Sequence, residues 1–362
     1  MEVNSERLYF ISSPPAVLSC AQRTNPKIIW EFKIEEDNYE LLPYVHELYG
    51  KVFLIASDLF QPTSDKVNYN LYLIVLDPNS GKELTRQPLS ITSLPCEGFN
   101  FPDVFCSFKN NQMVILSKRK TDLYEITSYE INNSGLIKKL WKKEFKIPKS
   151  LFFSNKDKKD IFIGLHNSSK FVIDDSYIYI PYQESQREPS QEITNKSLIA
   201  LDRISGKLIW KRNLQDPGSF ENFIEVYNSS EKDKILISTL DINSTNSETA
   251  FFYCIEQKNG NIIWQNRLIS SFNYSINNTD ETLWFVGEDN KNESIILNAI
   301  NIKEGTILGT FESKNKNIHN VYYDHNIILP YGKDEAIYIL GDGRIYDIKI
   351  TQDIMTQKLV DS

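Results

Sequence analysis

The sequence predicts an all-β fold, a single β-propeller of four-stranded antiparallel blades, with seven blades expected and six or eight as alternatives. Three observations predict it. Phe, Tyr and Trp make up 12% of the 362 residues and only 3 residues are Met, which suits strands better than helices. A frame of strand, glycine turn and strand returns along the chain. Short turns and long loops alternate between the expected strands, as on the two faces of a propeller.

The repeating frame is complete once, at residues 198–210, and returns with substitutions at 252–264, 74–85 and 298–309. An apolar run precedes the turn and an aliphatic pair follows it. The glycine supplies the positive φ of a short hairpin, and Asp, Asn or Ser before it caps the turn. A Trp four residues later is large enough to fill the gap between neighbouring blades. The frame makes these positions structural: Trp30, Asp77, Gly81, Ala200, Asp202, Gly206, Trp210, Gly260, Trp264 and Gly305.

With Ser205 at the hydroxyl position, the complete copy resembles the blade signature of the quinoprotein-like propellers, the pyrroloquinoline-quinone repeat family. The resemblance implies propeller blades. The other copies lose the Ala, the Asp or the Trp, so the resemblance says little about the quinone. No cofactor is predicted, pyrroloquinoline quinone is not expected, and a structural calcium ion is left open.

The blades follow from counting the strand–turn–strand units in one domain, residues 1–362. Ring closure is expected to use the first or the last strand. The expected blades are residues 7–34, 41–89, 101–147, 171–214, 223–268, 272–311 and 318–350.

The expected long loops mark one face of the propeller as the functional candidate. They are residues 58–70, 149–167, 183–195 and 241–248. An apolar side chain in a loop needs a surface to bury against, so Leu59 and Phe60 are contact candidates, although folding back onto their own blade is an equal alternative. The other predicted contacts with a ligand or partner are Tyr69 and Arg187.

Catalytic motifs with a recognised spacing are absent from the sequence. What remains is a set of side chains expected near the starts of inner strands, around the axial channel: His46, Asp103, His166, Glu225 and His319. Imidazoles and carboxylates that converge from different blades could act as acid and base or bind a metal. The alternative, which we favour, is a hydrogen-bonded channel lining around water. No metal site is predicted.

Charge and targeting features limit the partners. A net charge of −8 argues against nucleic acid, and the lysine-rich run 138–146 is expected to be a solvated outer strand. The N-terminus lacks a basic and apolar signal, so a cytoplasmic protein is expected, with export left open. No stretch approaches the roughly 18 apolar residues of a membrane span. The four Cys residues are expected to be reduced, with a Cys96–Cys106 bridge as the minority alternative.

Two functions follow from the sequence. The first is a non-catalytic binding or scaffolding propeller, monomeric, which holds a protein partner or a small-molecule ligand on the long-loop face and channel mouth. The second is an enzyme with its site at the channel mouth. Because propellers host both, the fold alone does not decide between them.

Overall fold

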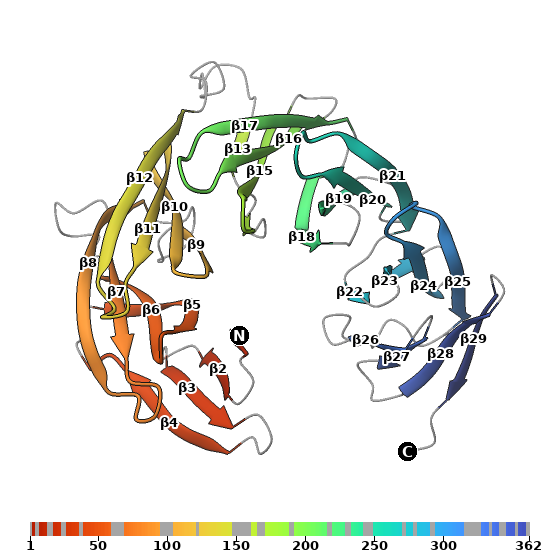
Figure 1. Ribbon diagram of the computed structural model, residues 1–362. Helices are drawn as coiled ribbons and strands as arrows, with labels where there is room; N and C mark the ends of the chain where they lie inside the picture. Colours follow the sequence, from red (N-terminus) through yellow and green to blue (C-terminus); the bar gives the residue numbers. More distant parts are fainter. Residues whose placement is uncertain are drawn as a thin grey trace. The chain divides into compact units, whose positions relative to one another are not determined.

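The computed structural model describes most of the strands and their turns. The described residues are 2–3, 7–12, 17–22, 27–35, 39–58, 69–94, 104–120, 123–146, 161–164, 171–187, 192–215, 219–228, 233–241, 249–269, 273–277, 281–289, 294–314, 327–332, 335–339, 345–351 and 354–359. Every regular element among them is a β-strand (Figure 1).

The described strands of the N-terminal part form three four-stranded antiparallel sheets, numbered in chain order. Sheet 1 contains β1 (Glu2–Val3), β2 (Arg7–Ser12), β3 (Val17–Gln22) and β4 (Ile28–Lys33). Sheet 2 contains β5 (Tyr39–Leu48), β6 (Lys51–Asp58), β7 (Tyr69–Leu76) and β8 (Glu83–Ser93). Sheet 3 contains β9 (Val104–Lys109), β10 (Gln112–Lys120), β11 (Leu123–Ile131) and β12 (Ile137–Lys146).

The described strands that follow form four more sheets. Sheet 4 contains β13 (Ile161–Gly164), β14 (Val172–Ile173), β15 (Tyr177–Arg187), β16 (Glu192–Asp202) and β17 (Leu208–Leu214), and β14 pairs with β15 outside the main path. Sheet 5 contains β18 (Ser219–Asn228), β19 (Asp233–Asp241), β20 (Thr249–Glu256) and β21 (Ile262–Ile269). Sheet 6 contains β22 (Asn273–Asn277), β23 (Thr282–Asp289), β24 (Ser294–Asn301) and β25 (Ile307–Lys314). Sheet 7 contains β26 (Ile327–Gly332), β27 (Glu335–Ile339), β28 (Ile345–Thr351) and β29 (Ile354–Leu359).

The chain divides into two compact units. Residues Met1–Phe152, Ile173–Ile178 and Leu201–Lys207 form the first, which holds sheets 1–3. Residues Phe153–Val172, Tyr179–Ala200 and Leu208–Ser362 form the second, which holds sheets 5–7. The expectation of one domain and the number of blades in the complete propeller stay predictions.

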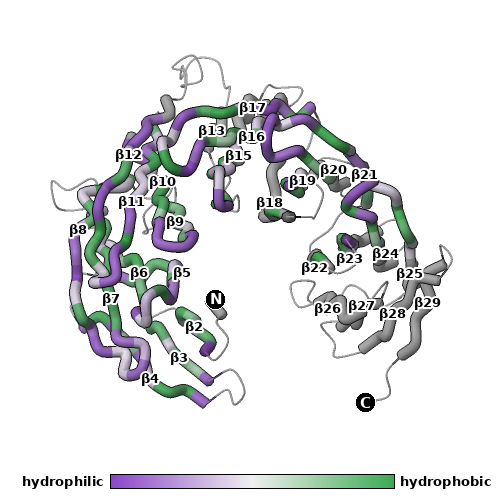
Figure 2. The backbone as a smooth tube through the Cα atoms, in the orientation of Figure 1, coloured by the Kyte–Doolittle hydropathy of each residue, from purple (hydrophilic) through white to green (hydrophobic). Residues whose placement is uncertain are grey.

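Burial along the strands explains the sequence pattern. Six consecutive residues of β6, Val52–Ser57, are buried because neighbouring strands cover both of its edges and neighbouring sheets cover both of its faces. The outer strand β17 buries only two of its seven residues, including Trp210. Figure 2 shows the same contrast in the first unit, with hydrophobic colour along β6 and hydrophilic segments along β12. Middle strands therefore read as continuous apolar runs and outer strands as broken ones.

Apolar residues fill the spaces between adjacent sheets. Between sheets 1 and 2 the core contains Leu18, Trp30, Leu54 and Ile74. Between sheets 2 and 3 it contains Ile55, Leu73, Met113 and Ile115. In the second unit, Phe252 of sheet 5 packs on Phe285 of sheet 6 with ring centroids 4.9 Å apart. Sheet 2 thus buries one face against sheet 1 and the other against sheet 3.

Two expectations about the fold need correction. Most of 183–195, predicted as a long loop, belongs to β15 and β16, which are 11 residues each; β13 pairs with β15 along residues 183–186. The last sheet extends to Leu359, beyond the expected end at 350.

Candidate functional site

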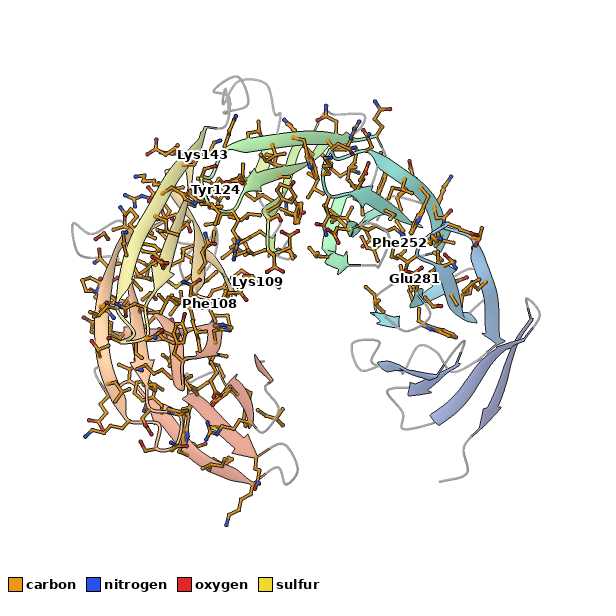
Figure 3. All side chains as sticks on the ribbon, in the orientation of Figure 1. Phe108, Lys109, Tyr124, Lys143, Phe252 and Glu281 are labelled. Atoms are coloured by element: carbon orange, nitrogen blue, oxygen red, sulfur yellow. The ribbon has the colours of Figure 1, made fainter. Side chains whose placement is uncertain are left out.

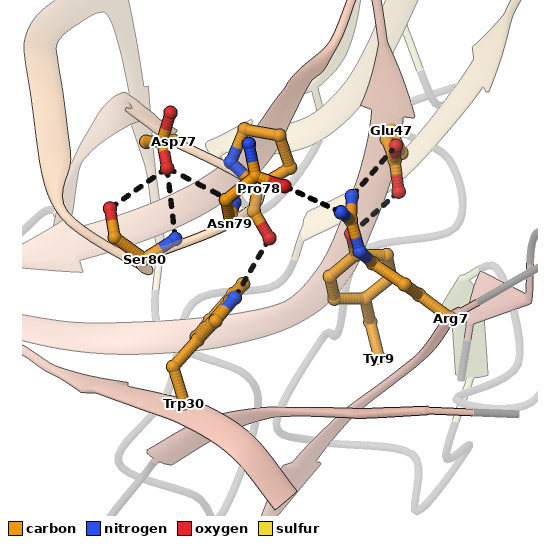
Figure 4. Close-up of polar contacts among 8 residues, drawn as sticks. All are labelled: Arg7, Tyr9, Trp30, Glu47, Asp77, Pro78, Asn79 and Ser80. Atoms are coloured by element: carbon orange, nitrogen blue, oxygen red, sulfur yellow. Dashed lines mark hydrogen bonds and ion pairs between the residues drawn. The ribbon is translucent and has the colours of Figure 1, made fainter.

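The end of sheet 2 that carries Gly81 shows how the repeating frame works. The Trp30 indole N–H of sheet 1 donates to the Pro78 carbonyl at 2.8 Å (Figure 4). A Cβ built on Gly81 would lie 2.6 Å from the Trp30 ring, and the φ of Gly81 is +69°. Only glycine therefore fits, for steric and for backbone reasons. The Asp77 carboxylate accepts from Ser80 N and Ser80 Oγ, both at 2.8 Å, and these bonds lower the pKa of Asp77.

The same contact recurs at three other turns, where a Trp lies on the glycine of the next sheet. The indole N–H donates to a backbone carbonyl of that turn each time, at 2.7–3.0 Å. The pairs are Trp141 with Gly206, Trp210 with Gly260, and Trp264 with Gly305. We call each such contact a Trp joint. Ala200 is buried in β16, and Asp202 accepts from Ser205 as Asp77 does from Ser80.

A second contact at these joints was not predicted from the sequence. The side chain two residues after the Trp donates to the carbonyl of the same glycine: Lys143 to Gly206 at 3.3 Å, Arg212 to Gly260 at 2.5 Å and Asn266 to Gly305 at 2.6 Å. The feature of the sequence that could have indicated these contacts is a polar residue two positions after each of these three Trp residues. These bonds satisfy a carbonyl that the tight turn would otherwise leave exposed.

The turn of sheet 3 has no Trp joint. Thr85 occupies the Trp position of sheet 2, and Gly135 instead has Val75 and the Lys51 side chain as neighbours. Gln87 still donates to the Gly135 carbonyl at 2.8 Å. At this turn sheets 2 and 3 are therefore joined by aliphatic contacts and by the hydrogen bonds of Gln87 to Gly135 and of Lys51 to the Asn133 carbonyl, without a Trp.

The end of the sheets with these glycine turns, the short-turn end, also holds the described inner-strand candidate His46. We expected His46 at the start of an inner strand, but it is the eighth residue of β5, close to the Tyr49–Gly50 hairpin. Its ring stacks on Phe108 of β9 with centroids 5.0 Å apart (Figure 3 labels Phe108). Glu225 likewise lies in the second half of β18, not at its start. Both residues were expected at strand starts because the sequence does not show at which residue each strand begins.

A polar network lies at the same end of sheets 1 and 2. The buried Tyr9 hydroxyl donates to Glu47 at 2.5 Å, and Arg7 pairs with Glu47 at 3.5 Å (Figure 4). Arg7 also donates to Asn79 at 2.7 Å. Burial raises the pKa of Tyr9, and the bond to Glu47 adds to the shift. The network links β2, β5 and the Gly81 turn, which is a structural role.

The opposite end of the sheets, where β6 connects to β7 and β10 to β11, is the long-loop end. In sheet 2 it carries Glu40, Ser57, Asp58 and Tyr69. The Ser57 hydroxyl is buried without a hydrogen-bond partner in the structure. Burial raises the pKa of Glu40 and raises that of Tyr69 to about 12. Tyr69, a predicted loop contact, is instead the first residue of β7 and fully buried, so it does not lie on a free surface.

In sheet 3 the long-loop end carries a buried ionic cluster. Glu125 is 3% exposed, with Lys142 Nζ at 2.7 Å and Arg119 Nη1 at 3.6 Å from its Oε2. Thr127 donates to its Oε1 at 3.1 Å. Ser117, the cross-strand partner of Glu125, has a buried hydroxyl without a partner in the structure. Paired residues of an antiparallel ladder share a face, so Ser117 and Glu125 lie side by side.

The facing surfaces of sheets 2 and 3 bring these two groups into one interface. Ser57 alternates with Phe53 and Ile55 of the common core, and Ser117 alternates with Met113 and Ile115. Leu94 N–H after β8 donates to the Lys118 carbonyl of β10 at 2.7 Å. The long-loop end of the interface between sheets 2 and 3 is thus polar, whereas its centre is the apolar cluster that includes Ile55, Leu73, Met113 and Ile115.

The structure does not describe several of the predicted site residues. Leu59, Phe60, Asp103, His166 and His319 fall outside the described residues, as do the side chains of Arg187 and Glu225. Cys106 is a free thiol whose pKa is raised by burial, and Cys96 lies outside the described residues. Within the described ranges no helix is long and apolar enough to cross a membrane.

Comparison with known proteins supports the fold. No family model and no curated protein matches the chain. A quinohemoprotein alcohol dehydrogenase from Comamonas testosteroni matches with a TM-score of 0.56 at 13% identity, over 99% of this chain and 66% of that one. A quinohemoprotein alcohol dehydrogenase from Pseudomonas putida HK5 matches with a TM-score of 0.54 at 11% identity, over 98% of this chain and 64% of that one. This chain therefore spans slightly less than two thirds of either structure.

A metal-supported quinone requires several carboxylate or amide ligands that converge. Within the part of the chain that the structure describes, no three His, Cys, Asp or Glu side chains come together as a metal site. The expectation that the chain holds no pyrroloquinoline quinone stays a prediction. With its all-β sheets and these similar structures, the chain has a β-propeller fold like that of the quinohemoprotein alcohol dehydrogenases.

Proposed function

We propose that this protein is a non-catalytic binding propeller that holds a ligand or partner at the long-loop end. The observation that carries the proposal is a pair of buried hydroxyls on facing surfaces of sheets 2 and 3. Ser57 and Ser117 Oγ, at the long-loop end, have no hydrogen-bond partner among the described residues. At the short-turn end all four joint indoles donate to a carbonyl, and the buried atoms without a described partner there belong to the Arg203 guanidinium of the Gly206 turn.

A buried hydroxyl without a partner costs about 1–3 kcal/mol. Proteins tend to tolerate such local violations at functional sites. Ser57 and Ser117 lie on facing surfaces of adjacent sheets. The cluster beside them adds the cations Arg119 and Lys142 on Glu125, with Glu144 3.5 Å from Lys142 Nζ. A polar ligand that reaches this end would supply the missing partners.

Affinity capture from native lysate, analysed for proteins and small molecules, tests this proposal. The variant Phe60→Asp changes a predicted contact of the long-loop face. The control Ile204→Asp changes a side chain at the short-turn end that is 66% exposed. We expect the bound species to be lost with Phe60→Asp and retained with Ile204→Asp. Retention with both variants, or loss with the control alone, would contradict the proposal.

The second candidate is an enzyme with its site at the channel mouth. In its favour, the two similar structures are named as alcohol dehydrogenases. Metal analysis of wild type, His46→Ala and His319→Ala separates the candidates. Bound metal that is lost in the variants would favour the enzyme, whereas unchanged metal content favours the binding propeller.

A further inference from the structure

The Glu125 cluster holds two cations at fixed positions near the surface of sheet 3. Glu125 lies in β11, and its carboxylate contacts Lys142 of β12 and Arg119 of β10. The side chains of Arg119 and Lys142 are 28% and 40% exposed, so solvent reaches both. The buried Glu125 carboxylate restricts the two partly exposed cations to few rotamers. Binding an anion therefore loses less side-chain entropy than it would with freely rotating cations.

The two cations have hydrogen-bonding capacity beyond Glu125. A guanidinium has five N–H donors and an ammonium has three, and the ion pair of Arg119 uses Nη1 at 3.6 Å. The hydrogen bond to Glu125 raises the pKa of Lys142, so this ammonium stays charged at neutral pH. Ser117 adds a buried hydroxyl donor beside the carboxylate.

The charge of sheet 3 favours an anionic ligand. Strands β9–β12 carry nine Lys and Arg residues against three Glu, which gives +6 in a chain whose net charge is −8. Lys143, labelled in Figure 3, and its neighbours on β12 belong to this set. An anion is therefore attracted to sheet 3 although the whole protein is acidic.

We propose that Arg119, Lys142 and the Ser117 hydroxyl bind a phosphate group of a small-molecule ligand, with Glu125 as the residue that positions the two cations. A tetrahedral phosphate offers enough acceptor oxygens for a guanidinium, an ammonium and a hydroxyl at once, whereas a planar carboxylate offers two. This inference rests on the proposed function, because it names the ligand chemistry of the same long-loop end.

Calorimetric titration of the full chain with inorganic phosphate, at constant ionic strength, tests the inference. Arg119→Gln and Lys142→Gln are each expected to raise the dissociation constant at least about tenfold, since each removes a charged hydrogen bond. Lys138→Gln removes the same charge from an exposed site on the same strand and is expected to change the constant less than about twofold. Titration with acetate is expected to show weaker binding than phosphate.

Two further variants separate positioning from general charge. Glu125→Gln makes sheet 3 more positive, so simple electrostatics predicts tighter phosphate binding. We expect weaker binding instead, because the cations lose their fixed positions. Ser117→Ala keeps every charge and is expected to raise the dissociation constant severalfold, with circular dichroism confirming that both variants are folded.

The inference is overturned if phosphate shows no saturable binding, or if Lys138→Gln weakens it as much as Lys142→Gln. It is also overturned if Glu125→Gln binds phosphate more tightly. If phosphate fails while Phe60→Asp still abolishes capture of a bound species, the ligand chemistry is wrong and the proposed function stands. If, in addition, Phe60→Asp does not abolish capture of a bound species, both the phosphate inference and the proposed function are wrong.

Discussion

Sheet 2 takes part in two interfaces that differ at both ends. Against sheet 1 its short-turn end holds the Trp30 joint, and its long-loop end holds Tyr72 edge-on to Tyr39 with Arg86 over the Tyr39 ring. Against sheet 3 the Trp is replaced by Thr85, and the long-loop end is ionic.

The cross-strand pairs of sheets 2 and 3 allow the two interfaces to be compared residue by residue. Ala56 pairs with Tyr72 in sheet 2, and Ser117 pairs with Glu125 in sheet 3. The two pairs are equivalent, because Ala56 and Ser117 are each the sixth residue of the strand that follows the inner hairpin. The interface between sheets 1 and 2 therefore has an Ala and a Tyr at this position, whereas the interface between sheets 2 and 3 has a Ser and a buried Glu. The binding function proposed above accounts for the polar pair, and the predictions below test the difference between the two interfaces.

The two interfaces are expected to differ most in the free energy of unfolding that is lost when Trp30 of the first interface or Thr85 of the second is replaced by Ala. Trp30 is 8% exposed, and Trp30→Ala should lower the free energy of unfolding by about 3–5 kcal/mol through lost burial and a cavity. Trp210→Ala and Trp264→Ala should have similar effects. Thr85→Ala should cost less than about 1 kcal/mol, because no wedge is lost. Thermal and urea unfolding followed by circular dichroism measure this; equal losses for Trp30→Ala and Thr85→Ala would contradict the comparison.

The glycines of the two turns should differ by a smaller amount. Gly81 and Gly135 both have positive φ, +69° and +85°, so Ala at either carries a backbone cost of about 1–3 kcal/mol. At Gly81 the added Cβ would also meet the Trp30 ring at 2.6 Å, whereas at Gly135 the nearest atom is Val75 Cγ1 at 3.3 Å. Urea unfolding should therefore rank Gly81→Ala as more destabilising than Gly135→Ala. The reverse order would show that the ring does not limit the turn.

The smallest expected difference is in pH dependence, because the turn of sheet 2 is capped by an acid and that of sheet 3 by an amide. The bonds from Ser80 lower the pKa of Asp77, whereas Asn132 accepts from Ser134 N and Leu136 N without titrating. A lowered pKa in the folded state means stability that is present above the unfolded value of about 3.9 and lost as pH falls through the folded value. Asp77→Asn should thus be slightly destabilising at pH 7 and neutral at low pH. A difference that persists unchanged at low pH would exclude the carboxylate as its source.

The sequence predicted a role between blades for Trp30, Trp210 and Trp264, and the last two follow a turn glycine by four residues. It did not predict the Trp141 joint, because Trp141 follows Gly135 by six residues. It did not predict the carbonyl contacts of Arg212 and Asn266, since a polar residue on an outer strand has many possible partners. It read 183–195 as a loop because this stretch is polar, yet backbone pairing with β13 holds part of it as strand.

The ionic cluster was also missed, for a different reason. Glu125 lies in a strand that alternates little in polarity, and its partners Arg119 and Lys142 come from two other strands. Only the register of the ladder brings them together. Buried polar contacts between strands depend on that register, which a single sequence specifies weakly.

The most direct test of the account compares two hydroxyls at the long-loop end of sheet 3. Thr127 is buried and donates to Glu125, and Ser117 is buried with no hydrogen-bond partner in the part of the chain that the structure describes. Thr127→Val should lower the free energy of unfolding by about 1–3 kcal/mol, because a hydrogen bond to a charged group is lost. Ser117→Ala should leave it unchanged or raise it, while weakening phosphate binding. If Ser117→Ala destabilises the protein as much as Thr127→Val and leaves phosphate binding intact, the Ser117 hydroxyl serves the fold and the long-loop end is not a binding site of this kind.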